Sequence, residues 1–288
     1  MISIASETLS ADIDPLGAQL SVLRDASGRD LLWDGDPAVW NGRAPVLFPI
    51  VGALENGAYR LDGGTYALAR HGFARRRLFE GAKTGPSAAI FRLRADDETL
   101  AVYPFRFELE IEFILEGSRL TMAARIGNRD DRPLPASFGF HPAFRWPLPF
   151  GEPRDRHAIW FDRDEPAPIR RLDARGLVER ASYPTPILDR WLFLRDALFE
   201  NDALILDQVR SRSVSYGAPT GPRLDIGFPD APYLGIWTKP GAAFVCIEPW
   251  WGIADPTGFA ADFRAKPGVF QVEAGETRRI AMSITLNS

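Results

Sequence analysis

The sequence predicts an all-β fold, a large antiparallel β-sandwich with few short helices. Apolar and polar residues alternate along many short segments, which is the pattern of half-buried strands. The chain also contains 25 glycines and 24 prolines, which separate these segments as turns do in all-β proteins. Helical periodicity is sparse, so packed antiparallel sheets are the expected architecture.

The clearest strand pair spans residues 107–126. From Phe107 to Leu115 every second residue is apolar, and three glutamates lie between them. This period of two predicts a strand with one buried and one solvent-facing side. Residues 116–119, EGSR, predict a turn, after which the alternation resumes from Leu120 to Ile126 on a return strand.

Several other segments repeat this pattern. GAYRLDGGTYAL, residues 57–68, predicts a hairpin with Asp62, Gly63 and Gly64 at its tip. Residues 274–277, AGET, predict the turn before the last strand. The further predicted strands are residues 88–96, 203–209, 213–217, 223–228, 233–239, 242–250, 268–274 and 278–286.

One helix is predicted, over residues 186–202, PILDRWLFLRDALFEND. No internal repeat, low-complexity tract or composition shift marks a linker. The 288 residues are therefore expected to form a single domain, residues 1–288.

Bulk composition excludes several function classes. The net charge of −4 gives no general attraction for nucleic acid or anionic lipid. No apolar run approaches the roughly 18–20 residues of a membrane helix, and the N-terminus lacks the features of a signal peptide. Cys246 is the only cysteine, so an internal disulfide or a cysteine-rich metal site is not expected. We expect a cytoplasmic protein with a small-molecule partner.

Four stretches depart from the alternating background. They are NGRAPVLFPIVG with Arg43, RHGFARR with His71, SFGFHPAFRW with His141 and CIEPWWGIADP with Glu248. Each places a polar or charged residue among apolar and aromatic neighbours beside a proline or glycine. A polar residue beside a proline or glycine is typical of strand ends and loops, where sites on β scaffolds are usually found.

Two of these residues are suited to proton transfer. Glu248 follows AAFVCI, a run expected to be a buried strand, and burial raises the pKa of a carboxyl toward that of a general base. Histidine titrates near neutral pH and can act as the acid. A structural histidine at His141, and an arginine-paired carboxylate at Glu248, are the alternatives that the local sequence allows.

Tryptophans accompany these residues, and aromatic faces pack well against the C–H faces of a sugar ring. Trp250 and Trp251 follow Glu248, while Trp146 and Trp237 lie in similar strand-end positions. No phosphate-binding GxGxxG or GxxxxGK[ST] loop, no GxSxG nucleophile elbow and no HExxH zinc motif occurs. The set predicts a carbohydrate pocket without metal.

These four motifs, in this order and over nearly the whole chain, resemble the aldose 1-epimerase (galactose mutarotase) family, and within it the LacX-like branch. The resemblance implies a β-supersandwich that interconverts the α and β anomers of free aldoses without a cofactor. It implies that His141 is the general acid at the ring oxygen. Glu248 would be the general base that takes the proton of the C1 hydroxyl.

The resemblance also implies residues that bind the substrate. His71 would support the ring oxygen, and Arg43 would bind sugar hydroxyls. An acidic residue before a strand would contact the sugar. Asp202 fits this role, with Asp207 as the alternative, and Trp250 is expected to pack against the ring.

Other polar residues have simpler interpretations. Arg43 could neutralise a buried carboxylate instead. Residues 75–77, three arginines, are expected on a solvated strand face, or else in a sugar-phosphate site. His157 is expected at the surface, and Cys246 as a small buried apolar residue.

The functional hypotheses are therefore three. The first is an epimerase of free monosaccharides. The second is a hexose-6-phosphate 1-epimerase, which would need two or more cationic side chains at one end of the pocket. The third is a non-catalytic carbohydrate-binding or sensing protein on the same fold.

Overall fold

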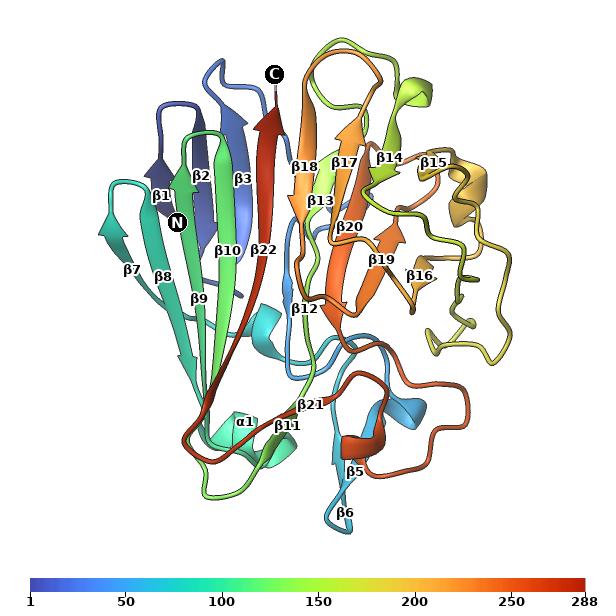
Figure 1. Ribbon diagram of the computed structural model, residues 1–288. Helices are drawn as coiled ribbons and strands as arrows, with labels where there is room; N and C mark the ends of the chain where they lie inside the picture. Colours follow the sequence, from blue (N-terminus) through green and yellow to red (C-terminus); the bar gives the residue numbers. More distant parts are fainter. Residues whose placement is uncertain (288) are drawn as a thin grey trace.

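The computed structural model describes residues 1–287, and it confirms the all-β class (Figure 1). Within these residues the only α-helix is α1, Asp97–Val102, six residues long. The other helical elements are the single 3-10 turns η1 (Glu55–Gly57), η2 (Ala74–Arg76), η3 (Arg154–Arg156), η4 (Asp196–Phe199) and η5 (Phe263–Ala265). None of the described helices is long and apolar enough to span a lipid bilayer.

The larger sheet of the described chain, residues 1–287, has nine antiparallel strands. In spatial order they are β15 (Trp191–Phe193), β14 (Ala158–Phe161), β17 (Ser213–Gly217), β18 (Arg223–Gly227), β22 (Thr277–Asn287), β10 (Arg119–Asn128), β9 (Phe107–Glu116), β8 (Ala88–Arg94) and β7 (Glu80–Gly85). The predicted turn at residues 116–119 joins β9 to β10 in register from Glu116 opposite Arg119.

A second sheet carries the candidate site. Its strands, over the same described residues, are β16 (Leu204–Leu206), β19 (Tyr233–Trp237), β20 (Phe244–Trp251), β12 (Phe138–Phe140) and β4 (Val46–Leu47), with β13 (Ala143–Arg145) also pairing with β20. In Figure 1 this sheet lies beside and behind the β14–β18 end of the larger sheet.

Three smaller groups of strands complete the fold. β1 (Ile2–Ala5), β2 (Leu9–Asp14) and β3 (Gln19–Asp25) form a three-stranded sheet. β11 (Leu134–Ala136) pairs with β21 (Phe270–Val272). The predicted hairpin is present as β5 (Ala58–Leu61) and β6 (Gly64–Ala67), with Asp62 and Gly63 at positive φ in its tip.

The alternating pattern has the expected physical meaning. Along β9 the apolar residues are buried and the glutamates between them are partly exposed. On the outer face Glu110 pairs with Arg92 and Arg125 of the neighbouring strands. The buried residues belong to one large apolar cluster to which both main sheets contribute, so burial of the inner faces holds the sheets together.

The predicted helix over residues 186–202 is wrong. Asp189 and Arg190 both have positive φ, which breaks a helix. The chain then forms β15 and η4. Leu192 and Leu194 are buried. Phe193, between them, is exposed, so the period of two is present, but the sequence hides it because all three residues are apolar.

His157 is buried rather than at the surface. Its Nδ1 lies 2.9 Å from the carbonyl oxygen of Pro153, and its Nε2 accepts the Leu148 N–H at 3.0 Å. Both ring nitrogens therefore have partners, which makes burial of the imidazole tolerable. The strand predicted for residues 75–77 is also wrong, because η2 occupies residues 74–76.

Candidate active site

Strand β20 positions the candidate base. All eight of its residues are buried, and Glu248 is only 1% exposed. Gly235 of β19 lies opposite Glu248, and Gly139 of β12 lies opposite Trp250. A Cβ atom on Gly235 would come within 2.3 Å of the Trp250 indole, so the absence of a side chain at Gly235 makes room for this ring beside the carboxylate.

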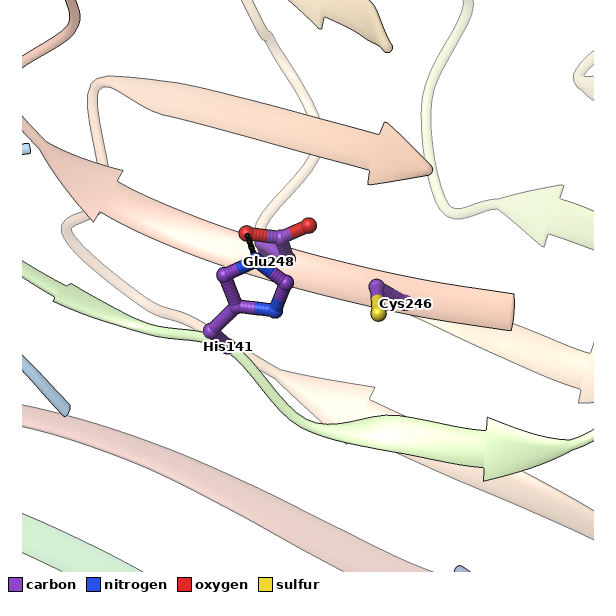
Figure 2. Close-up of side chains that lie close together, drawn as sticks. All are labelled: His141, Cys246 and Glu248. Carbon is purple, nitrogen blue, oxygen red and sulfur yellow. Dashed lines mark ion pairs between the residues drawn. The ribbon is translucent and has the colours of Figure 1, made fainter. Parts of the chain in front are cut away.

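His141 follows β12 directly and meets Glu248 across the sheet. The His141 Nε2 and Glu248 Oε2 atoms are 3.1 Å apart, although the residues are 107 positions apart in sequence, 248 minus 141. Figure 2 shows the ring and the carboxylate facing each other. Trp40 stacks on the imidazole at a centroid distance of 5.2 Å, so the pair lies in an aromatic surrounding.

Burial decides the charge states of this pair. It raises the pKa of Glu248 well above the ordinary value, an effect that the Trp250 N–H bond opposes and the nearby Asp202 charge reinforces. Burial also lowers the pKa of His141 to about 3. Because each group disfavours its charged form while they touch each other, one proton is shared between the two.

The second histidine of the site has a defined tautomer. The His71 Nδ1 atom accepts the Gly52 N–H at 3.1 Å, and burial keeps the pKa of this ring well below its usual value. The neutral ring therefore carries its proton on Nε2 and can act as a hydrogen-bond donor. His71 lies edge-on to His141, with ring centroids 5.8 Å apart.

A cavity of about 180 Å3, called here the inner cavity, brings these groups together. Its lining consists of Trp40, Arg70, His71, Arg75, His141, Leu172, Asp202, Ala203, Trp237, Glu248 and Trp250. Five of the six residues expected to act on substrate therefore line one cavity. The Trp250 Nε1 donates to Glu248 Oε2 at 3.2 Å, so this indole orients the carboxylate as well as covering the cavity.

Arg43 is the exception, because it does not line the inner cavity. Its Nη1 donates to the carbonyl oxygen of Ser21 at 2.7 Å, and its own N–H donates to Gln19 Oε1. These two hydrogen bonds connect the NGRAPVLFPIVG motif to β3. Arg43 contacts a carbonyl group, not the buried carboxylate considered as its alternative partner.

The choice between the two aspartates follows from their positions. Asp202, in a left-handed conformation with φ of 62°, lines the inner cavity. The guanidinium of Arg171 fixes this turn by donating to the carbonyl oxygens of Leu198 and Asp202, each at 2.9 Å. Asp207 lies outside the cavity lining and pairs with Arg170 at 2.9 Å.

Six lining residues were not among the predicted site residues, and four of these six are charged or aromatic. Arg70 and Arg75 flank His71 in the RHGFAR motif, and η2 turns Arg75 toward the cavity instead of leaving it on a strand face. Trp40 directly precedes the NGRAPVLFPIVG motif, and this position is the sequence signal that could have identified it as a site residue. Trp237 ends β19, and its position on the cavity follows from the pairing of β19 with β20.

One trio could also ligate a metal ion. Within residues 1–287, donor atoms of His141, Cys246 and Glu248 lie within 4.8 Å of one another (Figure 2). Metal binding would require the Cys246 thiolate. Complete burial instead raises the pKa of this thiol well above its usual value, with the Glu248 charge adding to the effect. Cys246 therefore acts as the small buried residue that the sequence predicted.

Comparisons with known proteins show the family and the fold. The family model described as "Aldose 1-epimerase" matches residues 1–285. The chain is 31% identical to the chromosomal LacX protein of Lactococcus lactis subsp. lactis over 296 aligned positions, which cover 99% of each chain.

Two crystal structures are also similar. A galactose mutarotase related enzyme from Lactobacillus acidophilus superposes with a TM-score of 0.91 at 31% identity, covering 100% of this chain and 97% of that one. A galactose mutarotase-like protein from Lactobacillus casei has the same TM-score at 28% identity and covers 100% of both chains.

Proposed function

The chain belongs to the aldose 1-epimerase family, and we propose that it is an enzyme that interconverts the α and β anomers of a free monosaccharide. The single observation that carries this proposal is the 3.1 Å contact between His141 and Glu248 in the inner cavity. Binding alone requires no acid and base in contact, whereas the opening of a hemiacetal ring requires both.

The reaction can be written with this pair. Glu248 takes the proton from the C1 hydroxyl while His141 gives a proton to the ring oxygen. The bond between C1 and the ring oxygen breaks, and C1 becomes an aldehyde. Rotation about the C1–C2 bond presents the other aldehyde face, and the reverse proton transfers close the ring. The protons return to their starting groups, so no group is transferred and no electron changes hands.

The position of the shared proton supports these roles. Glu248 can act as the base only when its proton resides on His141, which is the form in which His141 can act as the acid. Both forms of the pair carry the same total charge, so moving the proton over 3.1 Å changes no net charge in the cavity. Paired acid and base catalysis supplies roughly 10²–10⁴-fold for each group, which suits a reaction that already proceeds slowly in water.

The remaining lining residues would bind the sugar. The His71 Nε2–H can donate to the ring oxygen side, and the Asp202 carboxylate can accept from hydroxyl groups. Trp40, Trp237 and Trp250 offer apolar surface to the C–H faces of the ring.

A phosphorylated hexose is the second candidate substrate, because Arg70 and Arg75 both line the inner cavity. Two guanidinium groups are the minimum expected of a phosphate subsite. Arg75 donates to the backbone carbonyl oxygen of Arg70 at 3.1 Å, and the Arg70 guanidinium donates to the carbonyl oxygen of Arg175 at 3.2 Å.

The proposal is tested by polarimetry with freshly dissolved sugars. Wild-type protein is expected to speed the equilibration of α-D-glucose or α-D-galactose above the buffer rate. A strong preference for α-D-glucose 6-phosphate would show that the enzyme is a hexose-6-phosphate 1-epimerase instead. If the protein accelerates none of these while calorimetry detects sugar binding, it is a binding protein and the proposed catalysis is wrong.

A further inference from the structure

The imidazole of His141 has the face of an indole packed against it. The ring centroids of Trp40 and His141 are 5.2 Å apart and the ring planes are 27° from parallel, so Trp40 stacks on His141. Trp237 also contacts this imidazole, but edge-on, at 82° and a centroid distance of 6.1 Å. Trp40 is thus the nearer of the two indoles and the one that is stacked on the ring.

The segment around Trp40 is fastened to the segment that carries His141. The Trp33 Nε1–H donates to the Trp40 carbonyl oxygen at 2.8 Å. The Trp33 backbone N–H donates to the carbonyl oxygen of Ala143, close after His141 in sequence, at 3.0 Å. A Cβ atom on Gly42 would lie 2.3 Å from the Trp40 ring, so the glycine leaves room for the indole. Backbone contacts and close packing therefore fix the stack.

The titratable groups around His141 differ in how they act on its charge. They are His71, Arg70, Arg75, Asp202, Cys246 and Glu248. Glu248 favours the charged ring, but it is also the group that exchanges the proton with His141. Burial of the ring opposes the charge, and so does the positive charge of Arg75. Burial keeps the His71 ring and the Cys246 thiol neutral by shifting the pKa of each.

An uncharged aromatic ring can offset this opposition without taking part in the exchange. A cation within about 6 Å of a ring centroid is attracted by the negative face of the ring, most strongly by tryptophan and more so away from water. A neutral imidazole lacks this attraction, so the stack favours the charged form. The indole offers no acceptor nitrogen or oxygen, so it does not compete with Glu248 for the proton.

We propose that Trp40 is a positioning residue that stabilises the protonated form of His141, and with it the form of the pair in which Glu248 is an ionised base. This inference rests on the proposed function, since opening the sugar ring needs His141 as the acid and Glu248 as the base. Trp40 acts through His141 and takes no proton itself.

The test replaces Trp40 with tryptophan analogues that carry one, two and three ring fluorine atoms. Fluorine withdraws electrons from the ring and weakens its attraction for a cation, while the shape of the indole is kept. With the sugar that wild-type protein accelerates, kcat should fall with each added fluorine. Loss of uniform contact between the sugar and the indole would instead raise KM. Trp40→Leu should lower kcat about 5- to 30-fold, and Trp40→Phe should keep part of the rate.

The same analogues at Trp191 are the matched control, because this residue of β15 lies outside the lining of the inner cavity and should leave kcat and KM unchanged. A kcat that does not fall along the Trp40 series would overturn this inference and leave the proposed function standing. If wild-type protein accelerates no sugar, the proposed function fails and NMR decides the inference. The chain has three histidines, so the ¹⁵N signals of the His141 ring can be assigned and titrated. The midpoint pH of His141 protonation must fall as fluorine is added at Trp40, or the inference is wrong.

Discussion

Glu248 combines near-complete burial with a very small set of polar partners. Its Oε2 atom receives the Trp250 N–H at 3.2 Å and lies 3.1 Å from His141 Nε2. A carboxylate with so few donors is poorly stabilised in its charged form, so its pKa rises. Glu248 therefore keeps its proton at pH values where a solvated glutamate would be charged.

The raised pKa has a consequence for stability. The folded protein keeps the Glu248 proton at pH values where the unfolded chain, with a pKa near 4.5, has lost it. Wild-type stability should therefore fall as the pH rises from 4.5 toward the folded pKa, by at most about 1.4 kcal/mol per pH unit from this group. Glu248→Gln has no proton to lose, so its stability relative to wild type should increase over the same window.

Urea unfolding of both proteins at pH 4.5 and near neutral pH measures this difference. His141 acts in the opposite direction, because its lowered pKa costs stability as the pH falls from 6.5 toward 3. If the stability difference between wild type and Glu248→Gln is the same at the two pH values, burial does not raise the pKa of Glu248 as described.

At the scale of elements, β20 depends on glycines in the strands beside it. The Trp250 indole occupies space that side chains at Gly235 and Gly139 would fill, so three strands jointly set the position of this ring. The indole in turn orients Glu248 through one hydrogen bond. Strand pairing therefore sets the geometry of the candidate site.

Gly235→Ala should disturb the site without changing any polar group. The added Cβ would lie 2.3 Å from Trp250, and such overpacking costs about 1–3 kcal/mol. Displacement of the indole should also weaken its bond to Glu248 and lower kcat/KM. Gly85→Ala is the control, since a Cβ there meets nothing within 4 Å. Equal kcat/KM and equal urea midpoints for both variants would show that Trp250 does not need this space.

Local patterns predicted the elements better than the contacts between them. β9, β10 and β22 were predicted because alternation over about ten residues is a local property. The helix prediction for residues 186–202 failed because the strand there has apolar residues on both sides. Leu192 and Leu194 are buried, but Phe193 between them is also apolar although it is exposed, so no alternation of polar and apolar residues is visible.

The residues of the candidate site could be selected from the sequence where their chemistry was informative. His71, His141 and Glu248 stood out as polar groups in apolar surroundings, and they do meet in one cavity. Arg43 could not be placed correctly, because its partner Ser21 lies on a separate sheet. Trp40 and Arg75 reach the cavity through loop and 3-10 turn geometry, which has no periodic sequence signal.

At the scale of the whole molecule, a buried ion pair links segments that are distant in sequence. Lys266 Nζ and Asp255 Oδ1 are 2.6 Å apart, and both side chains are almost fully buried. The other Asp255 oxygen accepts the Glu55 N–H at 2.8 Å. The aspartate of the CIEPWWGIADP motif therefore connects the segment after β20 to η5 and to η1, which are distant in sequence.

Lys266→Met should strongly destabilise the protein, because it leaves the Asp255 carboxylate buried without its cation. The expected loss is about 3–5 kcal/mol in the free energy of unfolding, measured by urea titration. The double variant Lys266→Met/Asp255→Asn removes both charges and should recover part of the loss. Lys83→Met, at an exposed position, is the control. A Lys266→Met protein as stable as this control would show that the pair contributes nothing to the fold.

The central claim is that this fold brings His141 and Glu248 together to open and close a sugar ring. Its most direct test is the α–β exchange rate of D-galactose or D-glucose at equilibrium, measured by exchange NMR with wild-type protein, Glu248→Gln and the exposed control Glu273→Gln. We predict that Glu248→Gln loses roughly 10²–10⁴-fold of the acceleration, while calorimetry shows that it still binds the sugar and Glu273→Gln keeps the full rate. A Glu248→Gln protein that exchanges the anomers as fast as wild type would contradict the account.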